Sequence, residues 1–101
     1  MLKGVLEMKS VKVIAKTLKG DMALRKHWEE AKKLGFVHRF AFKKMGYKQS
    51  ICSEKPFSIM LEITNPYFQA VLTPDKFTAQ IIEAMKINGA EEIDYRIEAT
   101  E

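Results

Sequence analysis

The sequence Phe57-Ser58-Ile59-Met60-Leu61-Glu62-Ile63-Thr64 places a large apolar residue at every second position. This period of two predicts a β-strand that buries one face and exposes the other. Asn65-Pro66 then indicates a turn, and a mostly apolar run follows at residues 67–72. We therefore expect a hairpin in which residues 67–72 provide an additional strand. The buried face of this hairpin must be covered by a second layer, which the rest of the chain has to supply.

A helix is predicted directly after this hairpin. Thr73 suits the N-cap position, Pro74 suits the first helical position, and Asp75 places a carboxylate where it complements the helix dipole. The predicted helix covers residues 74–88, and its apolar residues at helical spacing are Phe77, Ile81 and Met85. Residues 93–99 alternate again, which predicts a final half-buried strand.

The beginning of the chain predicts one strand and one helix. Residues 11–18 alternate as a half-buried strand. Asp21 then suits the N-cap of a helix over residues 22–34, and Gly35 suits its end. The apolar residues at positions 5, 6 and 8 either extend the first strand or form a short strand of their own.

The middle of the chain completes the order of elements. Residues 36–42 are rich in aromatic side chains and predict a second strand, whereas residues 44–56 predict a long basic loop. The resulting order is β-α-β-β-(β)-α-β, which predicts a single α+β domain over residues 1–101. We expect a ferredoxin-like two-layer sandwich, with an antiparallel sheet of four to five strands and two helices on one face.

Composition argues against several classes of protein. The longest apolar runs are only a few residues, far short of the roughly 20 that cross a bilayer, so no membrane partner is expected. The first residues interrupt their apolar side chains with charge, unlike a secretory signal, so a cytoplasmic location is expected. The single cysteine, Cys52, cannot form an internal disulfide, which fits a reducing compartment.

Charge is divided unevenly along the chain. Residues 1–56 carry 14 Lys or Arg and 5 Asp or Glu, a net charge of +9, whereas residues 57–101 carry 3 and 8, a net charge of −5. This division favours an anionic partner for the basic half or head-to-tail self-association, unless interleaved strands mix the charges in space. Only 3 of the 17 basic residues are Arg, which suits loose phosphate attraction better than bidentate recognition.

Enzyme signatures are absent from the sequence, which has no glycine-rich phosphate loop, no Gly-x-Ser-x-Gly elbow and no His-x-x-x-His pair. His27, His38 and Cys52 match no metal-ligand spacing, so we interpret them as structural or surface residues. The alternative for Cys52 is a reactive thiol activated by nearby lysines. No catalytic residue, metal or cofactor is therefore expected.

One segment combines aromatic and basic residues more densely than the rest of the chain. Aromatic rings stack on unpaired bases while Lys and Arg contact phosphates, which is how open sheet faces bind single strands. The aromatic residues of the predicted strand 36–42 either pack in the core or lie on the open face, with Val37 and Ala41 inside. The candidate nucleic-acid-binding residues are Phe36, His38, Arg39, Phe40, Phe42, Lys43, Lys44, Tyr47 and Lys48.

Three hypotheses for function follow. The leading one is a small non-enzymatic binding module that holds nucleic acid, either RNA or a single strand, or another anionic partner, through this strand and the loop after it. The alternative is a homo-oligomeric regulatory or scaffold domain whose open sheet faces pair with each other. The third is an enzyme built on Cys52 and a histidine.

Overall fold

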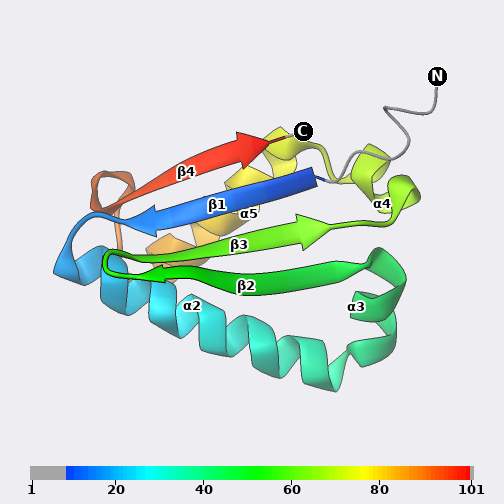
Figure 1. Cartoon of the computed structure of the whole chain (residues 1–101), viewed down its shortest axis with the longest axis horizontal. Coiled ribbons are helices and arrows are strands. Elements are labelled where there is room, and N and C mark those ends of the chain that lie inside the picture. The colour runs from blue at the N-terminus through cyan, green and yellow to red at the C-terminus, as the bar shows by residue number, and fades with distance from the viewer. Residues whose placement is uncertain (1–8, 101) are drawn as a thin grey trace.

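The computed structural model describes residues 9–100 (Figure 1). Positions 5, 6 and 8, for which the sequence allows an extra strand, lie outside the described residues. The elements in chain order are β1 (Lys9–Ala15), α2 (Leu18–Val37), α3 (Arg39–Met45), β2 (Tyr47–Glu54), β3 (Phe57–Ile63), α4 (Pro66–Val71), α5 (Pro74–Ile87), the 3₁₀ helix η1 (Glu92–Asp94) and β4 (Tyr95–Thr100).

The four strands form one antiparallel sheet in the order β2-β3-β1-β4. In the middle of the sheet, Val11 of β1 pairs with Leu61 of β3 on one side and with Ala99 of β4 on the other. α5 passes behind the sheet in Figure 1, and buried residues of α2 and α5 belong to the same core cluster as the inward side chains of the strands. The prediction of a small α+β fold with an antiparallel sheet and helices is thus confirmed.

The core lies between α2, α5 and the sheet face that they cover. Alternate residues of β1 and β3 are buried there, as the period of two predicts. Burying one valine, leucine, isoleucine or phenylalanine side chain stabilises the folded state by about 1.5–3 kcal/mol. On the opposite face, Lys12 of β1 lies beside Met60 and Glu98, so that face is largely polar. The largest fully buried side chains are Phe57, Leu24, Ile59, Leu61, Ile63, Met85, Val11 and Val13.

α5 begins where the sequence predicts. The side-chain oxygen of Thr73 accepts a hydrogen bond from Lys76 N at 3.4 Å, which makes Thr73 the N-cap. The helix ends at Ile87, one residue before the predicted end. The apolar residues that face the sheet are the predicted set of Phe77, Ile81 and Met85.

The outer strands differ from the predictions at their ends. β1 ends at Ala15 rather than at residue 18, because Leu18 already begins α2. β4 begins at Tyr95 rather than at residue 93, because Ile93 lies in η1, where it is exposed. The carboxylate of Asp94 caps the N-terminal end of that short helix by accepting a hydrogen bond from Glu91 N at 2.9 Å.

α2 is longer than predicted at both ends. The hydroxyl oxygen of Thr17 accepts a hydrogen bond from Gly20 N at 3.1 Å, so Thr17 and not Asp21 is the N-cap. Gly35 lies inside the helix, because one internal glycine costs only about 1 kcal/mol relative to alanine. The predicted end at Leu34 is wrong, and α2 continues to Val37.

The predicted strand over residues 36–42 is wrong. Residues 36 and 37 belong to α2, and α3 follows after a break at His38, whose φ and ψ are −109° and 42°. The edge of the sheet beside β3 is occupied instead by β2, so the predicted loop over residues 44–56 is also wrong. The β propensity of the aromatic residues is weak and depends on having a strand partner, which this segment lacks.

The additional strand predicted over residues 67–72 is a helix, α4. The side-chain oxygen of Asn65 accepts a hydrogen bond from Tyr67 N at 2.9 Å, and Pro66 occupies the first helical position. Asn65-Pro66 therefore starts a helix by the same chemistry as Thr73-Pro74, and the described sheet has four strands rather than five.

Candidate functional site

The end of α2 and the outer side of α3 form an exposed surface, named here the aromatic-basic corner. α2 diverges from β2 towards its C-terminal end, and α3 follows at that end of the molecule (Figure 1). Phe36 and Phe40 are 76% and 80% exposed, so both rings lie in solvent. The corner consists of the exposed residues Lys32, Lys33, Leu34, Phe36, Val37, His38, Arg39, Phe40, Lys43 and Lys44.

The apolar stripe of α2 explains why this surface is exposed. Ala23, Leu24 and Ala31 are buried and share one face of the helix. The stripe stops at Ala31, because Leu34, one turn later, is already 52% exposed. The last two turns of α2 therefore do not pack on the sheet, and their apolar side chains contact water.

Gly46 reverses the chain between α3 and β2. Its φ of 69° is left-handed, and a Cβ at this position would overlap the side chain of Thr64, so both conformation and space require glycine. Asn65 N donates to the Met45 carbonyl at 3.0 Å, and Asn65 Nδ2 donates to the Lys44 carbonyl at 2.9 Å. These bonds hold the C-terminal end of α3 against the end of β3.

The corner is positively charged. Residues 31–53 contain six Lys or Arg and no Asp or Glu. The Arg39 guanidinium lies over the Phe40 ring, 5.6 Å from its centroid, which is a cation–π contact. Exposed rings and cations thus occupy the same surface.

Six of the nine predicted site residues lie in the corner, and Phe42, Tyr47 and Lys48 do not. The Phe42 and Tyr47 rings meet edge to face with centroids 5.0 Å apart. Lys48 lies on β2, where it pairs with Glu62 of β3. Neither interpretation of a strand over residues 36–42 applies, because on a helix Phe40 is exposed while Phe42 is half-buried.

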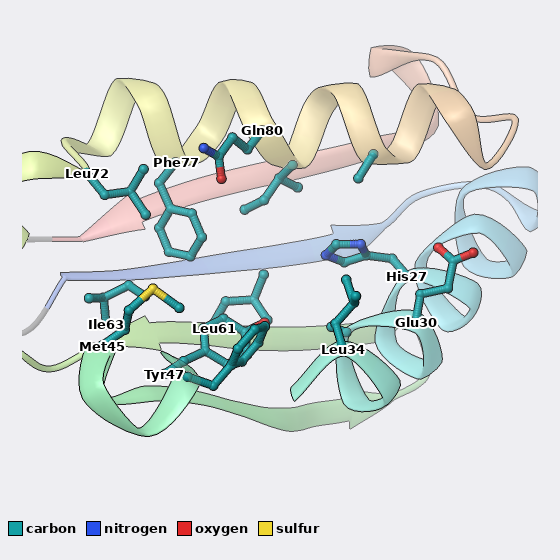
Figure 2. Close-up of a pocket in the computed structure, with 14 residues that line it drawn as sticks. His27, Glu30, Leu34, Met45, Tyr47, Leu61, Ile63, Leu72, Phe77 and Gln80 are labelled. Carbon is teal, nitrogen blue, oxygen red and sulfur yellow. The ribbon is translucent and has the colours of Figure 1, made fainter. Parts of the chain in front are cut away.

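Phe42 and Tyr47 line a cavity that the sequence analysis missed (Figure 2). Its volume is about 340 Å³, and residues of α2, α3, α5, β2 and β3 surround it. Figure 2 shows α5 along one side, α2 at one end and the segment around Met45 at the other. The main apolar side chains of its walls are Leu34, Phe42, Met45, Leu61, Phe77 and Ile81.

Four polar side chains also line the cavity: His27, Glu30, Tyr47 and Gln80. Burial lowers the pKa of His27, an effect that the Glu30 carboxylate partly opposes. Burial raises the pKa of Tyr47 to about 12. The Tyr47 hydroxyl donates to Gln49 Oε1 at 3.0 Å, so the side chain is held in place at the wall.

One sequence signal could have indicated this cavity. His27 follows Ala23 and precedes Ala31 by four residues, so it lies on the apolar stripe of α2 rather than on its rim. A histidine among small residues on a buried face leaves room that a larger apolar residue would fill. The contribution of Phe42 and Met45 was not predictable, because it depends on α3 being a helix.

The residues of the enzyme hypothesis are not assembled into a metal site. His27 lines the cavity, whereas His38 and Cys52 are exposed. Among residues 9–100, no three His, Cys, Asp or Glu side chains are grouped so that they could hold a metal ion.

No family model, curated protein or solved structure matches the chain. No helix within the described part of the chain has both the length and the apolar character that crossing a bilayer requires.

Proposed function

We propose that the protein is a non-enzymatic binding module that holds single-stranded nucleic acid on the aromatic-basic corner. The observation that carries this proposal is the exposure of the Phe36 and Phe40 rings among cations. An exposed ring offers a face on which an unpaired base stacks, a contact worth about 1–3 kcal/mol per base. The binding surface is helical, and it is distinct from the open face of the sheet.

The surrounding charges fit the phosphates of such a strand. Lys32 and Lys33 lie on α2, and Lys43 and Lys44 lie on α3, so cations flank the rings from two helices. Because residues 31–53 contain no carboxylate, no acidic side chain of this segment repels a phosphate. Lysines alone would attract any polyanion, and the exposed rings supply the preference for unpaired bases.

The test is a titration of a fluorescently labelled oligothymidine at several salt concentrations. We expect log K to fall linearly with log salt concentration, with a slope of about −0.7 for each phosphate that a lysine or arginine contacts. A matched duplex should bind more weakly than the single strand, because its bases are not free to stack. Absence of binding at low salt, or binding that salt does not change, would overturn the proposal.

Two pairs of variants separate the rings from the cations. Phe36→Ala with Phe40→Ala should weaken binding by about tenfold or more while leaving the salt slope unchanged. Lys43→Glu with Lys44→Glu should weaken binding and reduce the slope. The matched controls, Ile87→Ala and Lys76→Glu with Lys86→Glu, alter exposed residues of α5 and should have little effect.

A second candidate function is a homo-oligomeric regulatory or scaffold domain. The observation that favours it is the same exposed apolar surface of Leu34, Phe36, Val37 and Phe40, which a second copy would cover. The open sheet face is less suited to pairing, because Lys12, Glu62 and Glu98 lie on it. Salt distinguishes the two candidate functions. Added salt should strengthen self-association, measured by light scattering, because it screens the repulsion between like charges. The same salt should weaken nucleic-acid binding.

We also propose that the fold is ferredoxin-like and that the protein works in the cytoplasm. Support for the fold is the strand order β2-β3-β1-β4, with α2 and α5 as the connections that return to the sheet. Support for the location is the lone cysteine, which is an exposed free thiol. An experimental structure tests the first proposal, and fractionation of the source cells tests the second.

A further inference from the structure

We propose that the cavity between α2 and α5 is a binding site for a small, uncharged, mainly apolar molecule that carries one hydrogen-bonding group. This site adjoins the aromatic-basic corner and shares only Leu34 with it, because Phe42 and Met45 line the cavity while Phe40, Lys43 and Lys44 lie on the exposed side. Its existence does not depend on nucleic-acid binding.

The size and walls of the cavity suit a small ligand. Its 340 Å³ lies within the range of about 300–1,000 Å³ that is usual for ligand sites. Leu61, Ile63 and Ile81 form part of its walls and are themselves 1–2% exposed, so the lining includes the centre of the core. An apolar molecule that entered would therefore exchange water for contact with core side chains.

The shape of the helix layer keeps this space open. Asn88 Nδ2, just after α5, donates to Glu30 Oε1 of α2 at 3.3 Å and joins the two helices there. Ala31 of α2 and Ala84 of α5 both line the cavity, and their small side chains leave it unfilled. At the other end, the segment around Met45 borders the space (Figure 2).

The polar groups of the lining select the chemistry of the ligand. In Figure 2 the His27 ring points from α2 into the space between the helices, and Gln80 lies on α5 across from it. Neither side chain has a hydrogen-bond partner among the described residues, so the half-buried His27 and the exposed Gln80 are both available to a hydroxyl or an uncharged N–H group of a ligand.

The lining disfavours a charged ligand, because it offers no partner for an anion and its one carboxylate, that of Glu30, already accepts a hydrogen bond from Asn88 Nδ2. None of the described lining residues is Lys or Arg, and the Glu30 carboxylate would repel a carboxylate of a ligand. The lowered pKa of His27 keeps its imidazole neutral at neutral pH. Bringing an unpaired charge into apolar surroundings is strongly unfavourable, so an alcohol fits better than the acid of the same length.

The test uses N-phenylnaphthylamine, an uncharged dye with one N–H group whose fluorescence rises in apolar surroundings. The dye should bind saturably, with one molecule per chain, and decanol should displace it at a concentration at least about tenfold lower than decanoate does. Failure of the dye to saturate below about 1 mM protein, or displacement by decanoate as readily as by decanol, would overturn the proposal.

Substitutions that fill the cavity show whether the dye binds there. Ala84→Leu places a larger side chain in the cavity and should weaken dye binding by about tenfold or more. The matched control Ala79→Leu makes the same change at an exposed position of α5 and should bind as the wild type does. Ala31→Leu places the larger side chain in the cavity from α2. It replaces Ala84→Leu in the test if circular dichroism shows that Ala84→Leu does not fold.

Two results in the variants would overturn the site. The first is unchanged dye affinity in folded Ala84→Leu and Ala31→Leu proteins. The second is dye binding that appears only when light scattering detects a dimer, because the apolar surface would then lie between two copies. His27→Leu provides a further check: it removes a hydrogen-bond partner and should lower the affinity for both decanol and the dye severalfold.

Discussion

The hydroxyl groups of Tyr95, in the core, and Tyr47, packed against it, differ in their hydrogen bonding. The Tyr47 hydroxyl donates to Gln49 Oε1 at 3.0 Å, and Gln49 Nε2 in turn donates to the Trp28 carbonyl at 3.2 Å. The Tyr95 hydroxyl is buried and has no hydrogen-bond partner within the described residues. A buried polar group without a partner carries a desolvation cost of about 1–3 kcal/mol.

We therefore expect the Tyr→Phe substitution to affect the free energy of unfolding differently at the two sites. Tyr95→Phe removes the unpaired hydroxyl and should leave the free energy of unfolding unchanged or raise it by about 1 kcal/mol. Tyr47→Phe removes a hydrogen bond and should lower the free energy of unfolding by about 1 kcal/mol. Urea denaturation measures both, and greater destabilisation by Tyr95→Phe than by Tyr47→Phe would contradict the prediction.

His27 makes stability depend on pH. Burial lowers the pKa of the folded state, so the unfolded chain takes up a proton first as the pH falls. The free energy of unfolding should be highest above about pH 6.5 and decline below it, with a slope of at most about 1.4 kcal/mol per pH unit, until the folded pKa is passed. Glu30 on α2 and Tyr47 on β2 are the other titratable groups in the lining, and α5 and β3 contribute none.

His27→Gln should remove this part of the pH dependence, which denaturation at a series of pH values would measure. His38→Gln is the matched control, because His38 is exposed at the end of α2. Equal flattening of the slope by the two variants would show that His27 is not the cause.

At the scale of elements, the start of α2 depends on one side chain. Thr17 accepts from Gly20 N, and its hydroxyl also donates to Asp94 Oδ1 at 2.8 Å, which joins the helix to η1. Thr17→Ala should lower the free energy of unfolding by about 1 kcal/mol, the usual effect of losing an N-cap. Thr17→Ser keeps the hydroxyl and should stay close to the wild type, and thermal denaturation compares the two. Equal losses in both variants would mean that the methyl group, not the cap, is responsible.

The bonds to Asp94 also affect its acid–base equilibrium. Its hydrogen bond from the Glu91 backbone and then that from Thr17 hold the pKa of the Asp94 carboxyl below its ordinary value. The ionised form is therefore the one that favours the folded state, a contribution lost as the pH falls through the folded pKa.

Elements with a complete set of local signals were predictable, and those that depend on distant partners were not. α5 has a cap, a proline and a regular apolar face, and the prediction holds to within one residue. α4 begins with a similar signal, the N-cap Asn65 followed by Pro66. The apolar run after it is too short for its pattern to distinguish a helix from a strand. Residues 36–42 carry β-prone aromatic side chains, yet β2 takes the place in the sheet that they would need.

The candidate site divides in the same way. That Phe36, Phe40 and the lysines share a basic surface follows from their proximity in the chain. Phe42 turns inward and contacts Tyr47 because α2 breaks at His38 and the chain reverses at Gly46. Neither the break nor the reversal could be predicted from the residues at those two positions. The cavity is built from five elements, and the only local indication of it is the position of His27 on the apolar stripe of α2.

For the molecule as a whole, ligand binding in the cavity should stabilise the fold. The cavity exists only when α2, α5 and the sheet are assembled, so the dye binds the folded state alone. At about 100 times its Kd, N-phenylnaphthylamine should raise the free energy of unfolding by about 2.7 kcal/mol. Urea denaturation with and without dye measures this, and the gain should be absent in Ala84→Leu and present in Ala79→Leu.

The distribution of charge is also a property of the whole molecule. The order β2-β3-β1-β4 alternates strands from the basic and acidic parts of the chain, which mixes their charges within the sheet. The end of α2 and α3 lie outside this alternation and keep their cations together. The positive charge of the first part of the chain is therefore concentrated at the aromatic-basic corner, whereas positive and negative charges are mixed across the sheet.

The central position of β1 sets the order in which the protein can assemble during synthesis. β1 leaves the ribosome before any other described element, yet both of its neighbours, β3 and β4, come later. Val11 has no partner until Leu61 has been made, and its second partner, Ala99, is made later still. Such long-range pairing slows folding, so β1 stays without a partner strand in the nascent chain until β3 has been made.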